Sequence, residues 1–274
     1  MKYNKIKYIY LILLLLIISS LLIIKKSSNI NYNKDTELLN FEEEIKKYPS
    51  YNKDMLNKYF EEYKKSNNIV YSLNIVNYPN YYDDIVKEPY FKIDYYLTLI
   101  NKKYYIDESF NLNNLVEITN VHKIIRENET MKLNEECFNS YLKMYEHAKS
   151  LNIDLVVYSS YRSIDKQINI YNNSKNNSLV AKPYHSEHHT GLSIDIATLE
   201  SGLTNHFEYT DSFKFLNNYA HLYGFILRYP KNKEQITGYN YEPWHYRYVG
   251  IKHAKIIKEQ NITLEEYIYT NILL

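Results

Sequence analysis

The sequence predicts an α+β fold in which a mixed, mainly antiparallel sheet is flanked by helices. Helical and strand patterns alternate along the 274 residues at irregular intervals, unlike the regular repeat of a parallel doubly wound sheet. An uncharged N-terminal segment is long enough to cross a membrane, and an amphipathic helix follows it. We therefore expect an N-terminal transmembrane helix (1–26), a tether with a small helical accessory segment (27–90), and one larger domain (91–274).

The N-terminal segment 8–24 reads YIYLILLLLIISSLLII and carries no charge. Three lysines precede it and two follow it. A helix of this length approaches the thickness of a bilayer's hydrocarbon core, which predicts an uncleaved, single-pass signal anchor. A cleaved signal peptide fits the basic start and the apolar run equally well, but no A-x-A-like site follows. The lysine distribution favours a cytoplasmic N-terminus, with everything after Lys26 outside the cell membrane.

Composition excludes some partners. The 33 basic and 32 acidic side chains nearly cancel, so no overall field attracts nucleic acid, and we expect no nucleic-acid partner. The single cysteine, Cys137, has no partner for a disulfide and is expected to be buried. The sequence does not indicate an oligomeric state.

Apolar spacing predicts the other elements. Residues 27–40 are polar and aperiodic, as in a tether. Helices are expected over 52–68, 134–152 and 163–174, and over 213–224 with Gly224 as the stop. The 134–152 helix has one apolar face, formed by Cys137, Tyr141, Met144, Tyr145 and Ala148. Residues 153–163 and 192–197 read as strands, and 94–106 as a strand, a turn at Asn101-Lys102 and a returning strand.

The segment YHSEHHTGLSIDIA (184–197) is a candidate metal site. After Gly191, apolar and polar residues alternate, which directs Asp195 away from the apolar face. A turn at Thr190-Gly191 would return the His188 imidazole towards that carboxylate, and this ligand pair suits zinc. A solvated loop that leads into a half-buried strand explains the segment equally well.

The segment YEPWHYRYVG (241–250) supplies a third ligand candidate. Pro243 disfavours a helix, so Glu242 and His245 lie on an extended or turning segment. His245 is a possible ligand, and Glu242 is placed to accept a proton from the attacking water and deliver it to a leaving amine. The alternative is an aromatic-rich core strand with a hydrogen-bonded histidine.

The segment SSYRSIDKQ (159–167) places Arg162 where a strand ends and a helix begins. A guanidinium there can stabilise an oxyanion or bind a carboxylate, although arginines at strand ends usually pair with surface acids.

Together the segments YRSIDKQ, SEHHTGLSIDIA and YGFILRYPKNKEQITGYNYEPWHYRYVG resemble the successive motifs of the VanY-type D-alanyl-D-alanine carboxypeptidases. These zinc peptidases share a fold with the D-Ala-D-Ala dipeptidases and the hedgehog amino-terminal domain, and the resemblance runs from about Tyr96 to His253. It implies Zn²⁺ as cofactor and the following roles: metal ligands His188, Asp195 and His245; general base and acid Glu242; carbonyl polarisation by Arg162; and substrate binding by Gln167 and Ser186.

The resemblance does not extend ligand roles to His185, Glu187 or His189. The sequence departs from the family pattern at Ser160, where glycine is usual, and at Ser193, where alanine is common. Neither change removes a ligand or the base.

By this resemblance we expect a membrane-anchored, outward-facing zinc carboxypeptidase that removes the terminal D-alanine from peptidoglycan stem peptides. An L,D-carboxypeptidase acting on tetrapeptide stems is the alternative within the family. A dipeptidase for cytoplasmic D-Ala-D-Ala would gain nothing from a membrane anchor. A non-catalytic wall-binding module is the alternative from another class, and the presence of Glu242 argues against it, because binding alone needs no base.

Overall fold

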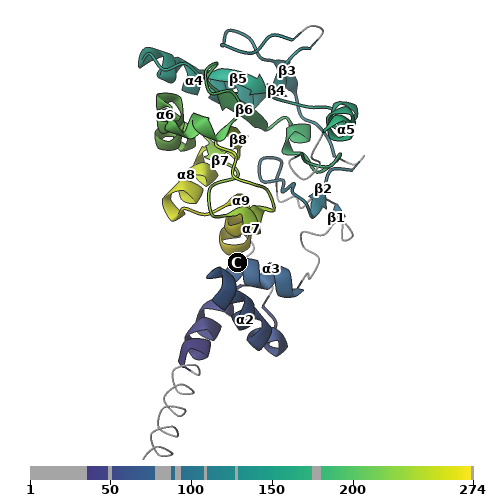
Figure 1. Ribbon diagram of the computed structural model, residues 1–274, viewed down its shortest axis with the longest axis vertical. Coiled ribbons are helices and arrows are strands. Elements are labelled where there is room, and N and C mark those ends of the chain that lie inside the picture. The colour runs from purple at the N-terminus through teal and green to yellow at the C-terminus, as the bar shows by residue number, and fades with distance from the viewer. Residues whose placement is uncertain are drawn as a thin grey trace, which may run out of the picture. The chain divides into compact units, whose positions relative to one another are not determined.

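The computed structural model describes residues 36–48, 51–77, 88–89, 94–107, 110–126, 129–174 and 180–272 (Figure 1). Contacts divide the chain into two units, one ending at Val76 and the other beginning at Asn77. The expected anchor, residues 1–26, lies outside the described residues, and so does residue 90 at the other predicted boundary. Within the described ranges, no helix is both long and apolar enough to cross a bilayer.

The N-terminal unit is a small helical body. It contains a helix over 36–45, a 3-10 turn (Lys53–Met55), α2 (Leu56–Ser66) and α3 (Ile69–Asn77). The helix predicted over 52–68 is confirmed. Residues 36–40 are helical, although we expected them to belong to the tether. The helix that they begin contributes side chains to the hydrophobic core of the N-terminal unit. That core contains Phe41, Ile45, Tyr59, Phe60 and Leu73.

The C-terminal unit mixes short strands with helices. Its strands are β1 (Glu88–Pro89), β2 (Tyr104–Tyr105), β3 (Leu115–Glu117), β4 (Lys132–Asn134), β5 (Val156–Ser159), β6 (Ser193–Ala197), β7 (Phe225–Leu227) and β8 (His245–Tyr248). Its α-helices are α4 (Glu135–Ser150), α5 (Ile164–Asn173), α6 (Asp211–Tyr219), α7 (Glu234–Thr237), α8 (Ile251–Gln260) and α9 (Leu264–Tyr267). Short 3-10 helices cover Glu187–Thr190, Asn205–Tyr209 and Ala220–Tyr223, and a π-helical turn covers Ile268–Ile272.

A four-stranded antiparallel sheet organises this unit. The strand order is β5-β6-β8-β7, so β6 and β8 are central. All five residues of β6 are buried, because one face of the strand packs on the core and the other lines a cleft. The predicted α+β class with a mainly antiparallel sheet is confirmed.

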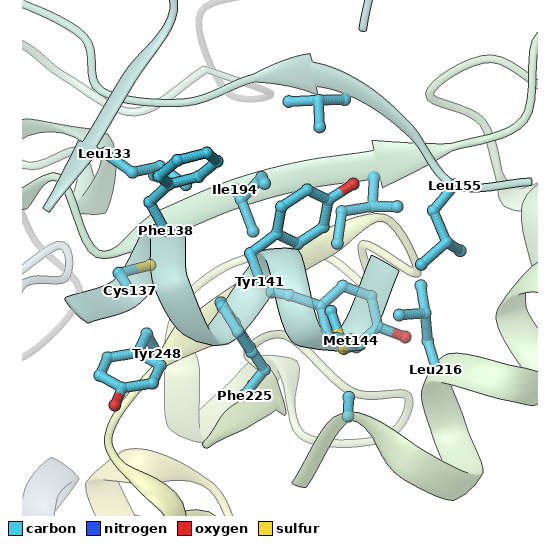
Figure 2. Packing of buried hydrophobic residues seen from close by; sticks show 14 of the residues in the cluster. Leu133, Cys137, Phe138, Tyr141, Met144, Leu155, Ile194, Leu216, Phe225 and Tyr248 are labelled. Atoms are coloured by element: carbon cyan, nitrogen blue, oxygen red, sulfur yellow. The ribbon is translucent and has the colours of Figure 1, made fainter. Parts of the chain in front are cut away.

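Helix α4 packs against this sheet through the face that the sequence predicted. The Asn134 side chain caps its first turn by accepting from the backbone N–H groups of Glu136 and Cys137. Cys137, Tyr141, Met144 and Ala148 are all buried. Figure 2 shows Cys137, Tyr141 and Met144 of α4 beside core residues contributed by the sheet: Ile194 of β6, Phe225 of β7 and Tyr248 of β8.

Two further helix predictions are confirmed. The 163–174 pattern forms α5, whose N-cap Ser163 accepts from the Lys166 N–H. The 213–224 pattern forms α6 and then the 3-10 helix Ala220–Tyr223, which ends at Gly224 with φ of 85°. A Cβ there would lie 2.6 Å from the Tyr248 ring, so this position requires glycine in both conformation and space.

The hairpin predicted over 94–106 is wrong in its first strand, although the chain turns at Asn101, whose N–H donates to the Tyr104 carbonyl, and returns as β2. Residues 94–97 form bends and turns, and β2 pairs in parallel with β1. Backbone groups of the would-be first strand bond elsewhere, because the Leu97 N–H donates to Asp94 and the Thr98 carbonyl accepts from Arg247. An alternating pattern in the sequence does not show that a distant arginine, Arg247, will donate hydrogen bonds to the carbonyls that a strand would need for pairing.

Candidate metal centre and active-site cleft

Two adjacent strands and one short helix bring three predicted ligands together. Asp195 of β6 lies directly opposite His245 of β8 in the antiparallel register, so both side chains project from the same face of the sheet. His188 comes from the 3-10 helix Glu187–Thr190, which ends at Gly191 with φ of 70°. A Cβ at Gly191 would lie 2.6 Å from the Leu115 side chain, so glycine is needed for the turn that returns His188 to the strand.

The donor atoms of these residues converge. His188 Nε2 lies 3.3 Å from Asp195 Oδ2, and His245 Nδ1 lies 3.0 Å from Asp195 Oδ1. The imidazole rings are nearly perpendicular, with centroids 5.0 Å apart. One ligand atom from each of the three buried residues lies within 4.8 Å of the other two, and no other such set is found among the described residues.

The other nitrogen of each imidazole faces away from this centre. His188 donates its Nδ1–H to the Ser160 carbonyl at 2.7 Å, which leaves Nε2 with its lone pair towards Asp195. His245 Nε2 faces the Glu187 carboxylate at 3.5 Å, and Nδ1 faces Asp195. This arrangement presents two imidazole nitrogens and a carboxylate oxygen to one point.

Burial and charge tune these groups. Burial lowers the pKa of His188, which favours the neutral imidazole needed for coordination. Burial opposes charge on His245, but the neighbouring carboxylates of Asp195 and Glu187 raise its pKa to about 9. Burial also opposes ionisation of Asp195, yet the two histidines hold the pKa of this carboxyl well below its usual range. Because the carboxylate of Asp195 stays ionised and the neighbouring carboxylates favour positive charge at His245, the space between these side chains is suited to a cation.

Glu242 stands beside the converging donors. Its N–H donates to the Tyr229 carbonyl, and Oε2 lies 3.8 Å from His245 Nδ1. Pro243 and Trp244 form the turn before β8, as the sequence predicted. Burial in the cleft raises the pKa of Glu242 to about 7, although His245 opposes the shift. A carboxylate with such a pKa can both take and return a proton near neutrality.

Arg162 faces the same cleft. Its Nη2 donates to the Ser159 hydroxyl and its Nη1 to the Gln167 side-chain carbonyl, both at 2.8 Å. Gln167 is fully buried and donates its amide N–H to the Ala181 carbonyl at 2.6 Å. Both ends of this amide are therefore engaged within the protein, and Gln167 is absent from the cleft wall, whereas buried Ser186 lines it.

The cleft has a volume of about 220 Å³. Besides the predicted residues, its wall includes side chains that sequence reasoning missed: Ile170, Val180, Leu203, Tyr229, Tyr239 and Trp244. The Tyr229 ring packs on His245, with centroids 4.9 Å apart at 33°. No local pattern distinguishes these aromatic and aliphatic residues from core residues.

The donor set fits zinc. Two histidines and one aspartate are typical of a catalytic zinc site, which leaves a further position for water or substrate. The outward hydrogen bond of His188 fixes its tautomer, as is usual for metal-ligating histidine. His188, Asp195 and His245 are the residues that would hold the ion.

Comparison with known proteins gives a consistent result. Residues 130–251 match the VanY family, described as D-alanyl-D-alanine carboxypeptidase. The putative carboxypeptidase YodJ of Bacillus subtilis (strain 168) is 40% identical over 181 residues, which cover 62% of this chain and 66% of YodJ. The chain spans between 52% and 69% of the length of four curated relatives.

Solved structures agree. The LdcB LD-carboxypeptidase is 40% identical with a TM-score of 0.58, over 62% of this chain and 84% of that one. A mutant of the D,D-pentapeptidase VanY from the VanB-type resistance cassette, in complex with Zn(II), is 28% identical with a TM-score of 0.54, over 64% and 99% of the two chains. On its sequence, its fold and the converging side chains of its cleft, this chain belongs to the VanY family of D-alanyl-D-alanine carboxypeptidases.

Proposed function

We propose that the protein is a zinc carboxypeptidase that removes the terminal D-alanine from peptidoglycan stem peptides. The observation that carries this proposal is the presence of three potential zinc ligands, a carboxylate with a raised pKa and a guanidinium in one cleft. The zinc complex of the related VanY pentapeptidase supports the choice of metal.

His188, Asp195 and His245 would hold the zinc ion, which would supply a Lewis acid for lowering the pKa of water and polarising a carbonyl. Glu242 accepts a proton from the attacking water and delivers it to the leaving amino group. Arg162 stabilises the charge that develops on the scissile carbonyl oxygen. Ser186 contributes to holding the peptide end, and Gln167 holds the Arg162 guanidinium through its side-chain carbonyl.

The pentapeptide that ends in D-Ala-D-Ala is the substrate that we propose, which makes the enzyme a D,D-carboxypeptidase. The structure of a related VanY protein in complex with D-alanine-D-alanine supports this choice. The tetrapeptide is the second candidate substrate, because LdcB, at 40% identity, is an LD-carboxypeptidase.

We further propose that residues 1–26 anchor the protein in the cell membrane by a single pass, with the catalytic unit outside. The uncharged run and its flanking lysines support this placement. Tethering would concentrate the enzyme at its polymeric substrate. Protease added to intact cells should digest the catalytic unit, and survival of that unit until lysis would contradict the proposed orientation.

The decisive experiment measures D-alanine release from penta- and tetrapeptide stems by the zinc-loaded full-length protein. We expect release from the pentapeptide, and a Glu242→Gln variant should lose activity by about 10²- to 10⁴-fold because general base catalysis is lost. Glu146→Gln, on the exposed face of α4, is the matched control and should retain activity.

Each other outcome has a defined meaning. Faster release from the tetrapeptide would identify the L,D-carboxypeptidase. Release that is unchanged in Glu242→Gln would overturn the mechanism. Zinc binding and binding to cell wall, without release from either peptide, would identify a non-catalytic wall-binding module.

A further inference from the structure

A cluster of buried charges lies next to the metal centre. Glu187, Arg228, Arg247 and Glu265 are each no more than 1% exposed. Arg228 Nε and Arg247 Nη1 both donate to Glu187 Oε1, at 2.8 and 2.7 Å. Burying four charged side chains costs free energy unless each one is paired with an opposite charge, so the partners of each group in this cluster are informative.

The two oxygens of the Glu187 carboxylate face different groups. Oε1 accepts from both guanidinium groups, whereas Oε2 accepts from the Ser193 hydroxyl at 3.3 Å. Oε2 also lies 3.5 Å from Nε2 of His245. The arginines therefore fix the carboxylate from one side and leave its other oxygen directed at the imidazole.

His245 Nε2 is fully buried and makes no hydrogen bond to any described residue, and its contact with Glu187 Oε2 is an ion pair at 3.5 Å. On its ring face, Tyr229 packs at a centroid distance of 4.9 Å. Its other nitrogen, Nδ1, faces Asp195 at 3.0 Å. An acceptor at Nε2 would hold the hydrogen on that nitrogen and the lone pair on Nδ1.

We propose that Glu187 is a positioning residue of the metal centre, which accepts the Nε2–H of His245 and so presents Nδ1 to the zinc ion. The proposal rests on the zinc site of the proposed function and adds a residue to which neither the sequence motifs nor the comparisons assign a role. Carboxylate partners of this kind fix the tautomer and orientation of metal-ligating histidines.

Helix α9 supplies the second anion of the buried charge cluster that contains Glu187. Arg228 donates two further hydrogen bonds to Glu265 of α9, at 2.6 and 2.8 Å, and Glu265 also accepts from the Asn101 amide. Two buried cations thus meet two buried anions. Glu265 and Asn101 both lie outside residues 130–251, which match the family, so the hydrogen-bond network around Glu187 extends beyond the family motifs.

The first test compares zinc affinity, by competition with a chelator, in the full-length protein and a Glu187→Gln variant. We expect affinity to fall by about 10- to 100-fold, the usual effect of losing a ligand's hydrogen-bond partner. Glu266→Gln is the control, because Glu266 lies on the same helix as Glu265 but pairs with Lys233. Unchanged zinc affinity in a folded Glu187→Gln variant would overturn the proposal.

A second test needs no variant to fold. In the zinc-loaded wild-type protein labelled with ¹⁵N-histidine, we expect the His245 ring to carry a slowly exchanging hydrogen on Nε2. A hydrogen on Nδ1, or coordination through Nε2, would contradict the assignment. Neither test uses substrate, so failure of D-alanine release with both results as expected would reject the proposed function and leave the role of Glu187 intact.

Discussion

Asp195 Oδ1 lies 3.0 Å from Nδ1 of His245, and the two residues are directly opposite each other in the antiparallel pair of β6 and β8. Backbone hydrogen bonding therefore sets the distance between two of the three predicted ligands. A shift of one residue in this register would turn one of the two side chains to the other face of the sheet.

Loss of one ligand should disrupt the metal centre without unfolding the sheet. A His245→Ala variant should lose more than about 100-fold in zinc affinity, because removing even an indirect partner costs up to that factor. Metal analysis after dialysis measures the effect. His206→Ala removes an exposed histidine of the same unit and should keep full zinc content; equal zinc in both variants would exclude His245 as a ligand.

The raised pKa of Glu242 predicts the pH dependence of the reaction. The base is active only when ionised, so kcat/KM should fall on the acid side as Glu242, whose pKa burial raises to about 7 in the metal-free cleft, becomes protonated. A zinc ion in the cleft attracts the carboxylate charge and moves the midpoint below 7. The profile should be recorded with zinc content measured at each pH, because protonated histidines release metal. A flat acid limb with zinc retained would show that Glu242 is not the base.

Gln167 should act on the reaction through Arg162. Because its side-chain carbonyl accepts from Nη1 of the guanidinium, Gln167→Ala should lower kcat more than it raises KM. In an Arg162→Lys background the same substitution should have a much smaller effect, since coupled residues show interaction energies of about 0.5–3 kcal/mol. Additive effects in this double-mutant cycle would instead support direct contact of Gln167 with the peptide.

Loss of the hydroxyl group should change the free energy of unfolding differently at two buried tyrosines, Tyr95 and Tyr141. The Tyr141 hydroxyl has no hydrogen-bond partner among the described residues, whereas the Tyr95 hydroxyl donates to the Thr190 carbonyl at 2.7 Å. Tyr95→Phe should lower the free energy of unfolding by about 1–3 kcal/mol, and Tyr141→Phe should leave it unchanged or raise it. Urea denaturation measures both, and a large loss of stability in Tyr141→Phe would reveal a partner for its hydroxyl.

Local sequence patterns were reliable where one element has one apolar face. The spacing of Cys137, Tyr141 and Met144 predicted the buried side of α4, and Gly224 marked the end of a helical segment. The first strand of the 94–106 hairpin was predicted wrongly, because the Tyr96 and Thr98 carbonyls bond to Arg247, about 150 positions later in the chain. Periodicity reports which face of a segment is apolar, but it does not report which distant group will bind its backbone.

The candidate site shows the same division. Local patterns were enough to predict the chemistry available, since the spacing around Gly191 and Pro243 placed His188, Asp195 and His245 on segments able to turn towards one another. Three relationships became visible in the folded chain alone: β6 and β8 are neighbours in register, the Gln167 amide accepts a hydrogen bond from Arg162, and Glu187 faces His245. The physical reason is that these relationships depend on packing between residues far apart in the chain, where burial forces each polar group to find a partner that no local pattern specifies.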